Sequence, residues 1–106
     1  MPKYMLRVNY TAEGAKGLVR EGGSKRRAIA QSAAESVGGK VESFHFAFGD
    51  TDAFVVADLP DAASAAAIAL TVSASGGATV QTTVLMTPEE LDAAAKKSPL
   101  YAAPGK

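Results

Sequence analysis

The stretch Val41–Leu59, VESFHFAFGDTDAFVVADL, decides the fold of this 106-residue chain. Two strand-like runs, Lys40–Phe48 and Ala53–Leu59, flank the turn-forming residues Gly49–Asp52 and predict a hairpin. In the first run, Phe44, Phe46 and Phe48 occupy alternate positions, and the chain's single histidine, His45, lies between the first two. Since alternate residues of a strand point to opposite faces, one face of the sheet packs on a core and the other is free for a different use.

Alternation and capping signals predict the other elements. Strands are expected at Lys3–Tyr10 and Ala78–Met86, and helices at Thr11–Val19, Ser24–Val37, Ala62–Ser75 and Thr87–Lys97. The order is β-α-β-β-α-β with an extra C-terminal helix, which is the ferredoxin-like pattern of an α+β fold. Right-handed crossovers would place both main helices on one face of a four-stranded antiparallel sheet. We expect a single domain over residues 1–97 and a C-terminal tail over 98–106.

The uncovered sheet face predicts self-association. We expect Phe48 to pair with Ala53, which sets the hairpin register. The open face then mixes polar and apolar residues: Met5, Arg7, Asn9, Ser43, His45, Ala47, Phe54, Val56, Asp58, Gln81, Thr83 and Leu85. Because this mixture is too apolar to face water across a whole sheet, we expect a homo-oligomer whose basic unit is a dimer resembling the dimeric α/β barrels. The alanine-rich helix Ala62–Ser75 offers a second contact surface, which would give trimers or hexamers.

Two such faces would enclose a half-polar cavity, for which the candidate ligand-binding residues are His45, Arg7, Asn9 and Asp58. Histidine is the residue type whose charge ordinarily changes near neutral pH. In the expected register Asp58 lies diagonally across from His45. The structural alternative is that His45 is a half-buried interface residue and that Arg7 pairs with an acid across the interface. The sequence does not indicate a catalytic residue or decide whether the protein is an enzyme.

A weaker candidate for anion binding is the basic segment after the glycine pair, Ser24, Lys25, Arg26 and Arg27. Backbone amides at a helix N-terminus, with three cations beside them, suit a phosphate or carboxylate. A solvated basic face paired with Glu21 or Glu35 is the alternative. Asp50 and Asp52 are explained by turn chemistry without a metal.

Composition excludes several classes of function. Eleven basic and eleven acidic residues cancel, which does not suit a nucleic-acid-binding protein. The chain contains no cysteine, and one histidine cannot build a multi-histidine metal site within one subunit. The N-terminus has no long apolar run, and the apolar segment Ala62–Val72 is too short to span a bilayer. We therefore expect a cytoplasmic protein without metal, cofactor, nucleic-acid or membrane partner.

Four segments carry a family resemblance: MPKYMLRVNYTAEGAKGLVREGG, KVESFHFAFGDTDAFVVADLPD, TVSASGG and TTVLMTPEE. Together they resemble the GYD domain family over about residues 2–96. The resemblance implies a small bacterial protein with a ferredoxin-like fold, and it brings no catalytic residues. The family's Gly-x-Tyr-Asp turn corresponds to Gly49–Asp52, with Thr51 at the tyrosine position.

The sequence thus predicts a homo-oligomer that binds a small organic or anionic ligand on its open sheet face. The alternative is a non-catalytic assembly or regulatory module in which that face only mediates oligomerisation.

Overall fold

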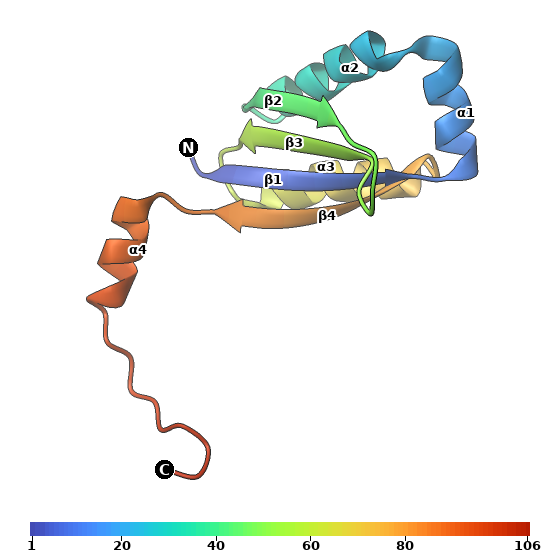
Figure 1. Ribbon diagram of the computed structural model, residues 1–106. Helices are drawn as coiled ribbons and strands as arrows, with labels where there is room; N and C mark the ends of the chain where they lie inside the picture. Colours follow the sequence, from blue (N-terminus) through green and yellow to red (C-terminus); the bar gives the residue numbers. More distant parts are fainter.

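The computed structural model describes residues 1–106 as an α+β structure with an open, four-stranded antiparallel sheet and four helices. In chain order the elements are β1 (Lys3–Tyr10), α1 (Ala12–Glu21), α2 (Gly23–Ser36), β2 (Lys40–Phe46), β3 (Ala53–Asp58), α3 (Ala62–Ala74), β4 (Ala78–Leu85) and α4 (Pro88–Ala95). The strands lie in the order β2-β3-β1-β4 (Figure 1). This order agrees with the predicted ferredoxin-like pattern.

The core lies on the sheet face that contacts α2 and α3. Alternate residues of β1 and β3 are buried there, and the cluster includes one alanine from each helix: Tyr4, Leu6, Val55, Ala57, Leu59, Ala34 and Ala65. The other residues of β1 and β3, such as Met5 and Phe54, lie on the face that no helix covers. The predicted division of the sheet into a covered and an open face is confirmed.

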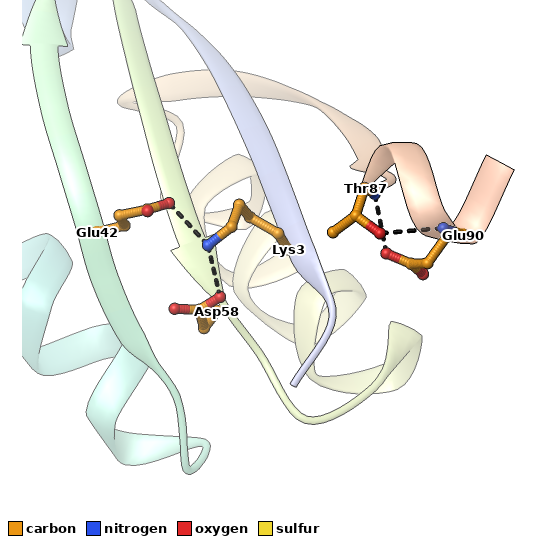
Figure 2. Close-up of polar contacts among 5 residues, drawn as sticks. All are labelled: Lys3, Glu42, Asp58, Thr87 and Glu90. Carbon is orange, nitrogen blue, oxygen red and sulfur yellow. Dashed lines mark hydrogen bonds and ion pairs between the residues drawn. The ribbon is translucent and has the colours of Figure 1, made fainter. Parts of the chain in front are cut away.

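Local signals set the starts of α1, α3 and α4 as predicted, whereas α2 begins at Gly23 without the expected Ser24 cap. Thr11, Asp61 and Thr87 are the N-cap residues of α1, α3 and α4, and each side chain accepts a backbone hydrogen bond. Gly22 has a φ of 90° and separates α1 from α2, which suits glycine because residues with a Cβ rarely adopt this conformation. At α4, Thr87 and Glu90 form a reciprocal capping box (Figure 2).

The predicted hairpin register is wrong by two residues. Ala53 pairs with Phe46 rather than with Phe48, and β2 contains a bulge between Val41 and Ser43. Because a shift of two preserves the faces, Phe44 and Phe46 still lie on the helix side. Phe48, however, lies in the loop beyond the strand and is fully exposed.

The hydrogen bonds of Asp52 explain why the hairpin loop is longer than predicted. Its carboxylate Oδ2 accepts a hydrogen bond from the Tyr10 backbone N–H at 2.9 Å, and its own N–H donates to the Val8 carbonyl at 3.0 Å. Asn9 Oδ1 also accepts a hydrogen bond from the Asp52 N–H, at 3.2 Å. The hairpin loop is therefore held by the end of β1, and the Ala47 N–H donates to the Asp52 carbonyl at 2.9 Å where the loop begins.

The C-terminal segment extends away from the rest of the molecule (Figure 1). None of the residues of α4 is buried, and the residues after Ala95 form no further helix or strand. The radius of gyration is 16.7 Å, compared with about 13 Å for a compact chain of roughly this length. No helix is long and apolar enough to cross a membrane.

Candidate functional site

The main cavity is an apolar groove on the helix side of the sheet, with a volume of about 390 Å³. Fifteen of its 20 lining residues are hydrophobic. Helices α2 and α3 form two of its walls with Ile29, Ala30, Ala33, Ala34, Ile68 and Val72. The strands form its floor with Leu6, Val8, Val41, Phe44, Val55, Ala57 and Val80.

Small side chains on α2 leave this space open. The groove-facing residues of α2 include three alanines, and the only buried residue of α3 is Ala65. An alanine fills much less volume than the leucine or isoleucine that usually packs between helix and sheet. On α3 the groove is lined by Ile68, Thr71 and Val72, so the helical alanines that border it come from α2.

Polar groups gather at one end of the groove. Tyr10, at the end of β1, pairs with Ala78 at the start of β4, and both residues line the groove. Arg26, from the first turns of α2, and Ser75, which caps the C-terminus of α3, also line it. Burial raises the pKa of the Tyr10 phenol, and the nearby Arg26 charge acts against that rise. The groove is therefore apolar along its length, with a cation and a phenol among its lining groups.

At the same end of the groove, Gly14 of α1 contacts Gly77, the residue before β4. Thr11 N–H donates to the Gly77 carbonyl at 3.0 Å, and the Thr11 hydroxyl donates to the Gly76 carbonyl at 2.8 Å. A Cβ placed on Gly14 would lie within 1.8 Å of the Gly77 oxygen. The start of α1 and the turn before β4 are thus in direct backbone contact.

On the open face the structure places Arg7 and His45 in one row across the sheet. Arg7 pairs with Gln81 and with Phe54, and Phe54 pairs with His45. Phe54 on β3 therefore lies between Arg7 on β1 and His45 on β2. Arg7 Nε is buried without a hydrogen-bond partner.

The other two predicted ligand residues have structural contacts. Asn9 holds the hairpin loop through Asp52. Asp58 lies opposite Lys40 instead of diagonal to His45, so the expected His45–Asp58 pair is wrong, because the register differs by two residues. Asp58 Oδ1 lies 2.9 Å from Lys3 Nζ, which also contacts Glu42 Oε2 at 2.8 Å (Figure 2). The hydrogen bond from Lys3 lowers the pKa of Asp58, and hydrogen bonds to Glu42 and Asp58 raise that of Lys3.

The four residues of the basic segment of α2 lie in three different environments. Lys25 Nζ pairs with Glu21 Oε2 at 3.2 Å, as the structural alternative expected. Arg26 lines the apolar groove, whereas Ser24 and Arg27 line a second, more open hollow of about 340 Å³ beside Phe44 and Phe46. The four residues Ser24, Lys25, Arg26 and Arg27 therefore do not line one common hollow.

The Gly49–Asp52 turn has a structural role in this chain. Asp52 joins the hairpin loop to the end of β1, and Thr51 is half-buried beside it. No group of three or more His, Cys, Asp or Glu side chains is arranged to hold a metal ion.

Sequence reasoning missed the groove. The available signal was the alanine content of both main helices at positions that face the sheet, which predicts a shortage of core volume. Tyr10 and Arg26 were each visible in the sequence, but only the pairing of β1 with β4 and the start of α2 bring them to one cavity.

The fold and cavity define a small α+β domain with an open antiparallel sheet on one side and an apolar groove on the other. The GYD domain family model matches residues 4–95, so the chain belongs to the GYD domain family. Comparison with curated proteins and with solved structures gives no match.

Proposed function

We propose that this protein binds a small, largely apolar organic molecule in the groove between its sheet and helices α2 and α3. The observation that carries the proposal is the groove, whose volume of about 390 Å³ and mostly hydrophobic lining match the few hundred Å³ and apolar walls of small-molecule sites. Burial of apolar ligand surface supplies the driving force for binding.

The groove supports ligand binding better than the open sheet face does. The residues expected to bind a ligand there, His45, Arg7, Asn9 and Asp58, line neither of the two main hollows. Asn9 and Asp58 are also engaged in contacts that hold the strands and the hairpin together. The open face is better explained as a surface that a second copy covers.

Titration of isotope-labelled protein with octan-1-ol and with octanoate, followed by amide chemical shifts, tests the proposal. Binding of at least one probe should shift groove residues such as Ile29, Ala33 and Ile68, and leave His45 and Phe54 unchanged. Absence of saturable shifts with both probes, or shifts confined to the open face, would overturn it.

A pair of substitutions on α2 gives the matched control. Ala33 lines the groove, whereas Ala28 on the same helix is exposed and does not. Ala33→Phe should fill the groove and abolish probe binding, and Ala28→Phe should leave binding unchanged. Thermal melts of both variants check that they fold.

Self-association through the open face, in a dimeric α/β-barrel arrangement on a ferredoxin-like subunit, is the second candidate function. Phe54 is 36% exposed on that face, beside the half-buried Met5, Val56 and Leu85. A lone domain seldom leaves such a surface to water. In this proposal the face builds an oligomer whose basic unit is a dimer, with or without ligand in the groove.

Sedimentation over a range of concentrations tests the assembly. Phe54→Asp should shift the protein toward monomer, because a charge on the open face disfavours its burial. Phe48→Asp is the control, since Phe48 lies at the exposed loop tip. A monomeric wild type at micromolar concentration would contradict the proposal, as would equal effects of the two substitutions.

A further inference from the structure

We propose that the ligand of the groove is an amphipathic organic monoanion, whose apolar body lies between the sheet and helices α2 and α3 and whose carboxylate binds Arg26 and Tyr10. This inference rests on the proposed function and specifies the chemical class of its ligand.

Charge is the first argument. Arg26 is the only charged residue among the 20 that line the groove. It forms no ion pair in the structure, whereas its neighbour Lys25 is paired with Glu21. Arg26 is half-buried beside an apolar cavity, where its positive charge would stabilise an anion through charge-assisted hydrogen bonds. One uncompensated cation suits one negative charge.

The distribution of polar groups is the second argument. The register of β1 with β4 puts Tyr10 opposite Ala78, and Ser75 and Gly77 precede Ala78 in the chain. These residues mark one end of the groove, and Arg26 is close enough to Tyr10 to act on its pKa. The opposite end, near Ala57 and Val41, is apolar. An apolar chain with a charged group at one terminus matches this polarity.

The acid beside Tyr10, Asp52, is already engaged. Asp52 contributes to the raised pKa of Tyr10, but its carboxylate accepts the Tyr10 backbone N–H and does not line the groove. Arg26 lies in the first turns of α2, where the helix dipole also favours a negative charge. The phenol donates to an anion when it is protonated, which is the form that a tyrosine side chain has at neutral pH.

Comparison of octanoate with octan-1-ol at pH 7.5 and low salt tests the inference, because the two probes share a chain and differ in charge. Octanoate should bind at least about ten-fold more tightly, as expected for one charge-assisted contact. Arg26→Gln should remove this preference by weakening octanoate binding much more than octanol binding. Lys25→Gln is the matched control and should keep the preference, because Lys25 lies outside the groove. Tyr10→Phe should weaken octanoate binding more than octanol binding.

Each outcome has a defined meaning. If both probes bind equally to the wild type, or if Arg26→Gln keeps the octanoate preference, the anion site is wrong while the groove stands as a binding site. If neither probe binds, the proposed function fails, and the inference fails with it. If Lys25→Gln and Arg26→Gln weaken octanoate equally, general surface charge rather than the groove explains the preference, which also overturns the inference.

Discussion

Gly14 shows how one missing side chain positions two elements. Its Cα lies against the Gly77 backbone, and a Cβ there would be 1.8 Å from the Gly77 oxygen. Because the obstruction is backbone and not a flexible side chain, it cannot move aside without displacing β4 or α1. The contact therefore gives a packing reason for glycine at position 14.

Two substitutions within α1 test this contact. Gly14→Ala should lower the free energy of unfolding by about 1–3 kcal/mol through overpacking. Gly17→Ala should raise it by about 0.5–1 kcal/mol, since the nearest atom to a Cβ on Gly17 is a side-chain nitrogen of Arg20 at 3.9 Å. Denaturant unfolding measures both. Equal effects of the two changes would show that the Gly14 contact is not constraining.

The Lys3–Asp58 pair should make stability depend on pH at both extremes. The pKa of Asp58 is lowered from its ordinary value of 3.8, so its stabilising contribution is complete above that value and is lost as pH falls through the lower, folded-state pKa. The pKa of Lys3 is raised from 10.5, so its contribution is complete below that value and is lost as pH rises through the folded-state pKa. Asp58→Asn should therefore destabilise the protein at pH 7 and have less effect near pH 2.

A double-variant cycle isolates the pair. If Lys3 accounts for the lowered pKa, Asp58→Asn introduced together with Lys3→Met should add little at pH 7 beyond Lys3→Met alone. Denaturant unfolding at several pH values measures the four proteins. Additive effects of the two changes would mean that Lys3 and Asp58 are not coupled.

At the scale of the hairpin, Asp52 holds the loop to the end of β1 and thereby sets the pairing of β2 with β3. Asp52→Ala removes an acceptor for the Tyr10 N–H and should cost about 1–3 kcal/mol of unfolding free energy. Asp50→Ala, at an exposed position of the same loop, should change stability by less than about 0.5 kcal/mol. Urea unfolding of the two variants, with amide exchange at Tyr10, checks the difference. Similar losses would assign the effect to turn propensity.

The elements that the sequence predicted are those that local rules determine. Alternation fixed the faces of the strands, and Thr11, Asp61 and Thr87 marked the helix starts. The register of the β2–β3 hairpin escaped prediction because it depends on the contact of Asp52 with β1. One of its partners there, Tyr10, lies forty-two residues from Asp52 in the sequence. The groove escaped prediction because it depends on the summed volume of side chains from two helices and all four strands.

At the scale of the whole molecule, residues 87–106, which include α4, form an arm that extends away from the body of the subunit. An isolated helix as short as α4 is not stable in water by propensity alone, and α4 has a capping box but no buried residue. Leu91, Leu100 and Tyr101 are all well exposed along it. The arm therefore contributes little to the stability of the body of the subunit.

Removing residues 87–106 tests this separation. The shortened chain should unfold with a free energy within about 0.5 kcal/mol of the full chain at low protein concentration. Thermal and urea unfolding measure it. A larger loss that grows with protein concentration would show that the arm packs on another copy, and a concentration-independent loss would show that it packs on its own subunit.

The alanines above the groove have a consequence for how related chains could diverge. The sheet floor is fixed by backbone hydrogen bonds, so its geometry resists change, whereas the depth available to a guest is set by Ala30, Ala33 and Ala34 on a single helix. Exchanging one of them for valine or leucine would shorten the accommodated chain by a few carbons without redesigning any strand. Under the proposed function, the length of the bound molecule would thus be set by a few neighbouring residues of α2, while the strands would stay unchanged.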